Sequence, residues 1–381
     1  MRRIPATLAA ALLAAVALAG LTEGEGPAQA QEICTGDTSA AGVPVRPGPR
    51  VRFGITPAGT AGALGTPVPV TPGTRAETLR ALARLRAPRR PFVLRLNRFF
   101  WSLRQAGFRK YLRRATGYTN RGYLVELQLR YHPDARQEGR IDRWLAFVRN
   151  VVRKFGRNPR VVGLQVANEV NFYPIAPDAS DSAYEGARRA LVRGVIAAHR
   201  LSRRLGYQQL EIGFNWAYRT DPGRERSFWE ELATGGRPFR RAVDWVGLDA
   251  YPGTVFPPTE PPGGEADGIV AAMSQLRRCF MPIAGLGAKV PIHVEENGWP
   301  TGPGRPEERQ EDALRGMVGA VQRFRGTYNV TDYRWFDLRD HNTSSGNFQQ
   351  HYGLLRDDYS AKPAFAAYRE LIRRFARRHG G

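Results

Sequence analysis

The stretch Val290 to Thr301 contains residue types that could do chemistry. It reads V-P-I-H-V-E-E-N-G-W-P-T, a short apolar strand that closes on Glu295 and Glu296, turns at Asn297-Gly298 and continues into Trp299. A carboxylate beside a large aromatic ring suits sugar chemistry, because the acid can attack or stabilise a positively charged carbon while the ring holds the sugar. The same residues are also compatible with an ordinary strand and turn whose acids are solvated.

A second acid, Glu169, stands at the end of another apolar run, which closes on Gln165-Val166-Ala167-Asn168-Glu169. Side chains of a strand alternate between its two faces, so Gln165 and Glu169 would share the polar face of this run. By the same alternation Ile292, Val294 and Glu296 share one face, which favours Glu296 over Glu295 as the inward-pointing acid. A bulge at the end of the strand would upset this choice.

The elements that must position these acids follow a repeating pattern. From Val51 onward, short β-prone runs alternate with longer amphipathic helical stretches. The predicted strands are Val51–Pro57, Phe92–Phe100, Tyr123–Tyr131, Val161–Val170, Leu210–Tyr218, Val243–Tyr251, Val290–Glu296 and Val330–Asp337. The predicted helices include Ala76–Arg86, Ile141–Phe155, Ala183–Leu205, Ile269–Arg278, Pro306–Arg325 and Pro363–Arg378.

Eight strands, each followed by a helix, predict an α/β protein with a single (β/α)8 barrel. The alternative is an open doubly wound sheet, which calls for a glycine-rich phosphate turn after the first strand with a helix directly behind it. Gly54-Ile55-Thr56-Pro57 leads instead into a long loop of Gly, Ala, Thr and Pro, so the barrel is preferred.

A barrel would bring Glu169 and Glu296 together, because strands four and seven lie across its mouth and active-site residues sit at the carboxyl ends of strands. Hydrolysis of a glycosidic bond needs such a pair. The pair could also bind a metal, but the histidines show no ligand spacing such as H-E-x-x-H. We therefore expect neither a metal nor a cofactor.

Polar and aromatic residues occur at the other predicted strand ends as well. They are Arg95 and Asn97, Tyr131-His132, Asn215-Trp216, Asp249-Ala250-Tyr251 and Trp335. Trp216 and Trp335 could equally be core fillers, and His132 a turn histidine. Taken together, such residues at successive strand ends are typical of a barrel active site.

These motifs resemble those of the clan-A glycoside hydrolases, the (β/α)8 retaining glycosidases with one Glu on strand four and one on strand seven. Asn168-Glu169 resembles that clan's Asn-Glu pair, in which Glu is the general acid/base and Asn contacts the sugar. Glu296-Asn297-Gly298 is similar to the E-N-G of β-glucosidase-type members, and Glu296-x-Gly298-Trp299-Pro300 to the E-x-G-W-P of β-1,3-glucanases and β-1,4-galactanases. The resemblance implies that Glu296 is the nucleophile.

The resemblance also implies roles for supporting residues. Arg95 matches the strand-two Arg near the nucleophile, and Tyr251 matches the strand-six Tyr that hydrogen-bonds it. His132 resembles the strand-three His of cellulase-like members. Trp335 resembles the strand-eight Trp that forms the floor of the sugar subsite. Trp299 either lines the cleft or packs the turn. The signatures of several families are mixed, which leaves the sugar, the linkage and endo or exo action open.

The N-terminus carries an export pattern. Arg2 and Arg3 precede the apolar run Ile4–Leu21, and Ala28-Gln29-Ala30 supplies small residues at a cleavage site. We predict a signal peptide over 1–30, a flexible leader over 31–50 and the catalytic domain over 51–381, which makes the mature protein secreted and without a membrane span. In an exported chain, Cys34 and Cys279 could form a disulfide or remain separate thiols.

The formal net charge is +22, carried almost entirely by arginine. The arginines are spread over nearly every predicted helix, whereas a nucleic-acid binder would gather them on one face. We expect a solvated basic surface, a carbohydrate partner and a monomer, with attraction to anionic cell-surface polymers as a further option.

Three other functions compete with the retaining glycosidase. A catalytically silent carbohydrate-binding barrel would lack one acid or its supports, and both remain. A transglycosylase would use the same residues with a different acceptor. A Schiff-base aldolase needs a lysine near a strand mouth, and Lys289 precedes strand seven at the opposite end.

Overall fold

The computed structural model of the protein describes residues 42–58, 69–172, 179–218, 222–255 and 264–376. The predicted signal peptide and Cys34 lie outside these residues, so export and the disulfide stay predictions. Cys279 is buried. None of the helices in the described part of the chain combines the length and the hydropathy that a bilayer crossing requires.

Eight parallel strands close into a barrel in sequence order, with β1 pairing with both β2 and β8. They are β1 (Arg52–Ile55), β2 (Val93–Phe100), β3 (Leu124–Arg130), β4 (Val161–Val166), β5 (Glu211–Ala217), β6 (Trp245–Ala250), β7 (Ile292–Asn297) and β8 (Val330–Trp335). The predicted (β/α)8 barrel is confirmed, because closure removes the free sheet edges that an open doubly wound sheet would have.

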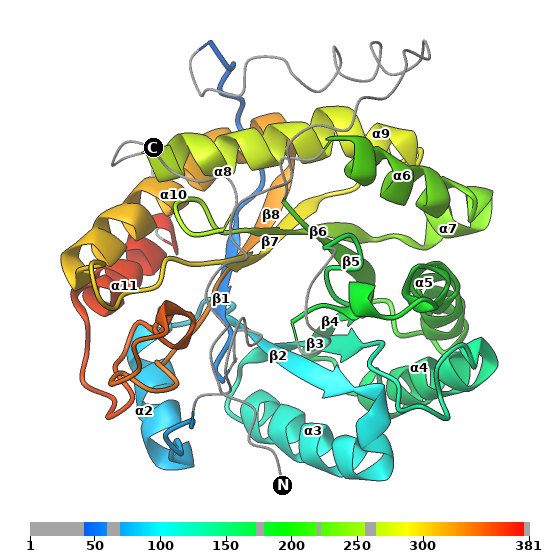
Figure 1. The fold of residues 1–381 in the computed structure, drawn as a ribbon, viewed down its shortest axis with the longest axis horizontal. Coiled ribbons are helices and arrows are strands. Elements are labelled where there is room, and N and C mark those ends of the chain that lie inside the picture. Colours follow the sequence, from blue (N-terminus) through cyan, green and yellow to red (C-terminus); the bar gives the residue numbers. More distant parts are fainter. Residues whose placement is uncertain (1–41, 59–68, 173–178, 219–221, 256–263, 377–381) are drawn as a thin grey trace, which may run out of the picture.

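Helices form the outer layer around the strands (Figure 1). They are α2 (Arg75–Leu85), α3 (Arg104–Thr119), α4 (Ile141–Phe155), α5 (Ala187–Arg204), α6 (Pro222–Ala233), α7 (Gly236–Ala242), α8 (Gly264–Gln275), α9 (Met281–Ile283), α10 (Glu307–Tyr328) and α11 (Pro363–Ala376). Helix α4 shows why the helices pack against the strands. Its apolar residues Ile141, Trp144, Leu145 and Val148 recur at helical spacing and are all buried. Short 3-10 turns at Trp101–Leu103, Asp181–Ala183 and Phe348–Gln350 and a π-helical turn at Leu276–Phe280 complete the elements.

Strand β4 ends earlier than the sequence predicts. The predicted strand runs to Val170, but β4 stops at Val166. The backbone leaves the extended conformation at Ala167 and again at Glu169, whose φ angles are 66° and 47°. Glu169 therefore lies in the turn that follows β4, not within the strand. Strand β8 likewise ends at Trp335, two residues before the predicted end at Asp337.

A bulge in β7 corrects the predicted alternation of that strand. Leu248 of β6 pairs with Val294, but the next residue, Asp249, pairs with Glu296, so Glu295 is an extra residue. Ile292 and Val294 face outward into the apolar core. Both Glu295 and Glu296 point into the barrel. Strict alternation placed Ile292 and Val294 on the same face as Glu296. This was wrong, because the extra residue Glu295 shifts the alternation by one position.

The inside of the barrel is charged, not apolar. Its almost fully buried side chains include Arg95, Glu126, Gln165, His293, Glu295, Asp332 and Arg334. Glycines make room for them: a Cβ atom at Gly54 would lie 2.6 Å from Cδ of Arg334, and one at Gly163 2.7 Å from Cγ of Glu126. The apolar core lies instead between the strands and the helices, where for example Phe53 contacts Tyr333 and Tyr368.

Candidate active site

Glu296 lies at the carboxyl end of β7 and is held by the two side chains predicted to support it. Nη1 of Arg95 donates a hydrogen bond of 2.6 Å to Oε1 of Glu296, and the hydroxyl of Tyr251 donates one of 2.6 Å to Oε2. Nε2 of Gln128 lies 3.4 Å from the same Oε1. Burial and then the charge of Glu296 raise the pKa of Tyr251 well above its ordinary value, so the hydroxyl remains a donor. These bonds fix the position of both carboxylate oxygens of Glu296.

Glu169 sits in a different environment. It is half-buried, and its backbone N–H donates a 2.9 Å hydrogen bond to Oδ1 of Asn215. Only Nδ2 of Asn168, at 3.4 Å, donates to its carboxylate among the bonds of the described residues. Burial, and then the negative charge of Glu296, raise the pKa of Glu169 to about 8. Glu169 therefore holds its proton at neutral pH. The carboxylate of Glu296, by contrast, accepts hydrogen bonds from Arg95 and Tyr251.

Three carboxylates meet at this mouth. One oxygen each of Glu169, Asp249 and Glu296 lie within 4.8 Å of one another. Asp249 is buried at the end of β6, and Nδ2 of Asn215 donates to its Oδ2. Burial and the charges of Glu296 and Glu169 raise the pKa of Asp249 well above its ordinary value. The sequence placed Asp249 at a strand end but did not show its closeness to both acids.

Asn168 and Asn215 form the frame between the acids. Oδ1 of Asn168 accepts hydrogen bonds from Nδ2 of Asn215 at 2.9 Å and from Nε2 of Gln128 at 2.7 Å. The backbone N–H of Asn168 donates to Oδ2 of the buried Asp181 at 2.9 Å. Asp181 thus anchors the turn whose left-handed backbone directs Glu169. Both predicted asparagines are in the site, and Gln128 and Asp181 were not identified from the sequence.

Two predicted sugar-binding tryptophans point away from the mouth. Trp216 is fully buried against Trp229 and Phe280 outside the barrel, and its Nε1 donates to Glu225. Trp335 is also fully buried and donates from Nε1 to the carbonyl of Tyr352 at 3.3 Å. Both are core residues, because outward positions of a barrel strand face the helices.

The sequence held a signal for this correction. In Asp332-Tyr333-Arg334-Trp335 the charged residues alternate with the aromatic ones, so once Asp332 and Arg334 point inward, Trp335 must point outward. The aromatic ring near the nucleophile is instead that of Phe336. Its centroid lies 6.2 Å from that of Tyr251 and 5.6 Å from that of Tyr352.

Trp299 and His132 lie near the rim of the site. Trp299 is 5% exposed, with the guanidinium of Arg305 only 3.8 Å from its ring centroid, so it packs the turn after β7. The ring of His132 stacks on Phe100 with a centroid separation of 4.4 Å and contacts Tyr184 edge-on. Nδ1 of His132 also lies 3.3 Å from the hydroxyl oxygen of Ser102.

Comparison with known proteins identifies the fold. No family model and no curated protein sequence matches the chain. Among solved structures, GH5_18 from Streptomyces cattleya in complex with GlcNAc superposes with a TM-score of 0.56 at 16% identity, over 86% of this chain and 81% of that one. The β-D-glucuronidase of Dictyoglomus thermophilum gives 0.54 at 15% identity, over 87% and 51%. A family 17 β-1,3-glucanosyltransferase from Rhizomucor miehei gives 0.50 at 16% identity, over 82% and 96%.

The chain has the (β/α)8 fold of the clan-A glycoside hydrolases. It spans about half the length of the glucuronidases that it matches. Because many activities share this fold, what the chain does has to be argued from its own site.

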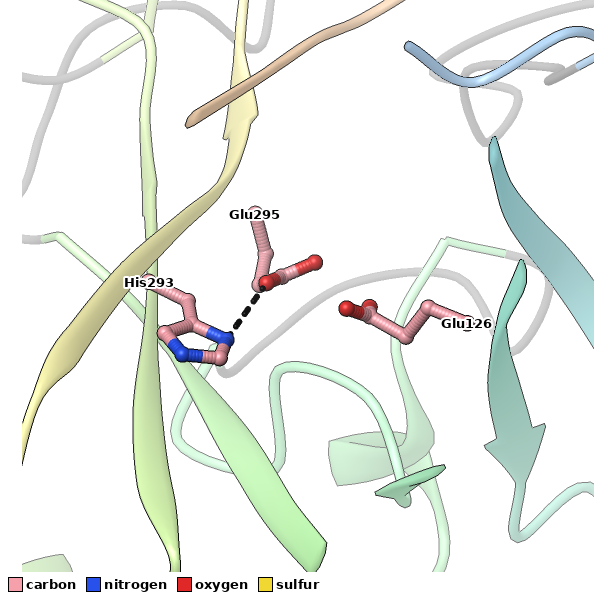
Figure 2. A group of neighbouring side chains, drawn as sticks. All are labelled: Glu126, His293 and Glu295. Carbon is pink, nitrogen blue, oxygen red and sulfur yellow. Dashed lines mark ion pairs between the residues drawn. The ribbon is translucent and has the colours of Figure 1, made fainter. Parts of the chain in front are cut away.

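A charged layer of buried side chains lies inside the barrel against Arg95, and Figure 2 shows three of its members, Glu126, His293 and Glu295. Glu126 points toward Glu295, and Nδ1 of His293 lies 3.3 Å from Oε1 of Glu295. Nε of Arg95 lies 3.6 Å from Oε1 of Glu126 and 3.4 Å from Oε2 of Glu295. Arg334 adds a second guanidinium, 3.4 Å from Glu126.

The layer is arranged for charge balance. Burial, and then the charge of Glu295, raise the pKa of Glu126 well above its ordinary value. Although ligand atoms of Glu126, His293 and Glu295 lie within 4.8 Å of one another, the guanidinium groups of Arg95 and Arg334 already supply the positive charge that such a cluster needs. We therefore assign no metal to it. Its role is to hold Arg95, which in turn holds Glu296.

Proposed function

We propose that this chain is a secreted, retaining β-glycoside hydrolase in which Glu296 is the nucleophile and Glu169 the general acid/base. The observation that carries the proposal is the pair of carboxylates in unlike environments, with oxygens within 4.8 Å of one another. Retaining enzymes place the two carboxyl groups about 5–5.5 Å apart, whereas inverting enzymes leave about 6.5–9.5 Å for a water molecule. Nearest oxygens within 4.8 Å of one another are compatible with the retaining separation and with direct attack by Glu296.

In the first step, an oxygen of ionised Glu296 attacks the anomeric carbon and the bond to the leaving oxygen breaks. Protonated Glu169 donates its proton to that oxygen, and a glycosyl ester forms on Glu296. Ester formation removes the negative charge of Glu296. Because that charge helps to raise the pKa of Glu169, the pKa then falls, and Glu169 becomes the base that takes a proton from the attacking water.

The hypothesis is tested with a panel of aryl β-glycosides and of β-glucan, mannan, xylan and galactan polymers. We expect Glu296→Ala to abolish turnover on every substrate that the wild type cleaves. Glu169→Ala should retain more activity on aryl glycosides with good leaving groups, because these need no proton. NMR of the first-formed product should show the β anomer.

Other outcomes point to the competing functions. Product of inverted configuration, or full activity of Glu296→Ala, would refute the assignment. Release of nothing from any substrate would favour a silent binding barrel, and longer oligosaccharide products would favour a transglycosylase. Export is part of the proposal and rests on the pattern over residues 1–30. N-terminal sequencing of protein from the culture medium tests it.

A further inference from the structure

A large basic cavity opens at the carboxyl ends of β1, β2 and β8, the same end of the barrel as the catalytic pair. Its volume is about 850 Å³, within the range of about 300–1,000 Å³ typical of ligand sites. Its walls come from the end of β1, the start of α2, the end of β2, helix α3 and the loop after β8. Helices α2 and α3 are neighbours in the outer layer (Figure 1), and Arg75 of α2 reaches across to Gly117 of α3.

Six cationic side chains line this basic cavity: Arg75, Arg98, Lys110, Arg113, Arg114 and Arg339. No Asp or Glu is among its described lining residues, and residues 59–68, which connect β1 to α2 in sequence, include no charged residue. The sequence predicted arginines spread evenly over a solvated surface. The fold instead brings cations from distant parts of the chain to one hollow.

The positive charge of the basic cavity is largely uncompensated. Within the described ranges, no carboxylate lies at ion-pair distance from Arg75, Lys110, Arg113 or Arg114. Burial, and then the charges of Arg114 and Arg98, lower the pKa of Lys110. The acids behind the wall contact uncharged lining groups: Asp357 and Glu77 accept hydrogen bonds of 2.7 Å from Thr71 and Thr74, and Asp337 lies 3.0 Å from His341. An anion entering the cavity would therefore meet several cations at once.

One side chain connects this cavity to the nucleophile. The backbone N–H of Arg98 donates a 2.7 Å hydrogen bond to Oε1 of Gln128, and Nε2 of Gln128 lies 3.4 Å from Oε1 of Glu296. Asn97, which also lines the cavity, follows Arg95 by two residues on β2. The basic cavity therefore lies one buried side chain, Gln128, away from the nucleophile.

The walls also offer aromatic surface. Phe100, Tyr111, Tyr118 and Tyr359 line the cavity, and the guanidinium of Arg98 lies 5.0 Å from the ring centroid of Phe100. Apolar rings with a few charged donors are the usual lining of a site that orients a polar ligand. Guanidinium groups suit planar carboxylates and sulfate esters, because they offer paired donors.

We infer that the basic cavity is a glycan subsite that selects a sugar unit carrying a carboxylate or a sulfate, so that the substrate is an acidic polysaccharide. This inference rests on the proposed glycosidase function. It adds a substrate class that neither the barrel fold nor the catalytic pair specifies.

The test compares each acidic β-linked polysaccharide with a derivative of the same polymer that carries less negative charge. Polymannuronate and hyaluronan are used before and after carboxyl reduction, and chondroitin sulfate before and after desulfation, so that linkage is held constant. We expect the wild type to have a kcat/KM at least about tenfold higher on the charged member of the pair that it cleaves, with a KM that rises with added salt. Loss of preference after carboxyl reduction identifies a uronate, and loss after desulfation identifies a sulfate ester.

The variant Arg75→Gln/Arg114→Gln removes two charges from the cavity. We expect it to lower the ratio of charged to neutral kcat/KM by about tenfold, since each exposed ion pair contributes up to about fivefold. The matched control is Arg149→Gln/Arg153→Gln, which removes two exposed arginines from α4 on another side of the barrel. Equal loss of preference in the control would overturn the inference, because overall net charge would then explain it.

Failure of this inference is separable from failure of the proposed function. If the wild type cleaves neutral glycans with Glu296 required and shows no preference for charged ones, the subsite is refuted and the glycosidase stands. If nothing is cleaved, calorimetric titration of the acidic and neutral polymers still measures binding, and equal affinities refute the subsite. Tighter binding of single-stranded DNA than of every acidic glycan would also overturn it in favour of a nucleic-acid site.

Discussion

Neutralising Glu296 should lower the pKa of Glu169. The two carboxylates have oxygens within 4.8 Å of one another, and Coulomb's law with an effective dielectric constant of about 20 gives roughly 3.5 kcal/mol for two charges at that separation. This energy corresponds to about 2.5 in pKa. Because Glu169 is half-buried and water screens part of the interaction, we expect Glu296→Gln to lower the pKa of Glu169 by about 2.

The assay is a carboxyl carbon-13 NMR titration of protein labelled at glutamate, with the Glu169 resonance identified by its loss in Glu169→Gln. In the wild type the resonance should titrate near the raised pKa of about 8, and in Glu296→Gln at a distinctly lower pH. A slow 2-fluoro glycoside that esterifies Glu296 should have the same effect. The wild-type rate should correspondingly fall as pH rises through the pKa of Glu169, because the proton donor is then lost.

A wild-type pKa near the ordinary value of 4.5 for glutamate would refute the assigned environment of Glu169. A raised pKa that stays unchanged in Glu296→Gln would refute the coupling and leave burial as the whole cause. The control is Glu138→Gln, which removes a carboxylate near Tyr131 that is not among the charges acting on Glu169. In this control the pKa of Glu169 should equal that of the wild type.

Three further outcomes are expected. Tyr251→Phe removes the 2.6 Å hydrogen bond to Glu296 and should lower kcat/KM about 10- to 100-fold with an unchanged melting temperature, since bonds to charged groups contribute about 1.5–3 kcal/mol. Arg334→Leu removes the 2.6 Å bond to the buried Asp332, which keeps Arg52 at 3.0 Å, and should lower the free energy of unfolding in urea by about 1.5–3 kcal/mol. Trp216→Ala empties a fully buried site and should cost about 3–5 kcal/mol of stability without raising KM.

Each of these outcomes has a control and a contrary result. Tyr207→Phe alters a half-buried tyrosine remote from Glu296 and should leave kcat/KM unchanged, whereas equal activity of Tyr251→Phe would remove that tyrosine from the site. Arg149→Leu removes an exposed arginine and should change stability by less than about 0.5 kcal/mol. A similarly small effect of Arg334→Leu would contradict the stabilising role of the charged layer. A raised KM in Trp216→Ala would indicate that the Trp216 ring contacts the substrate.

Most of the architecture could be predicted from local pattern. Runs with period two and stretches with period near 3.6 predicted all eight strands, because those periods follow from backbone geometry and burial of one face. Glu169 and Glu296 were placed at strand ends for the same reason. The strand ends themselves were less certain, since Ala167 and Glu169 leave the extended conformation through contacts with Asn215 and Asp181 that lie far away in sequence.

Other features of the site had no local signature. The bulge at Glu295 is a property of the pairing between β7 and β6, so it appears only when the two strands are in register. Asp249 became a member of the site because barrel closure brings β6 beside β7, not because of its neighbours in sequence.

The sequence by itself determined which chemical groups stand at which strand ends, because alternation and turn chemistry act over a few residues. The tertiary structure decided their electrostatics. The raised pKa of Glu169, the bonds from Arg95 and Tyr251 to Glu296, and the convergence of Arg75 and Arg339 on one cavity all depend on through-space distances. Burial and Coulomb interactions follow those distances, and only the closed barrel establishes them.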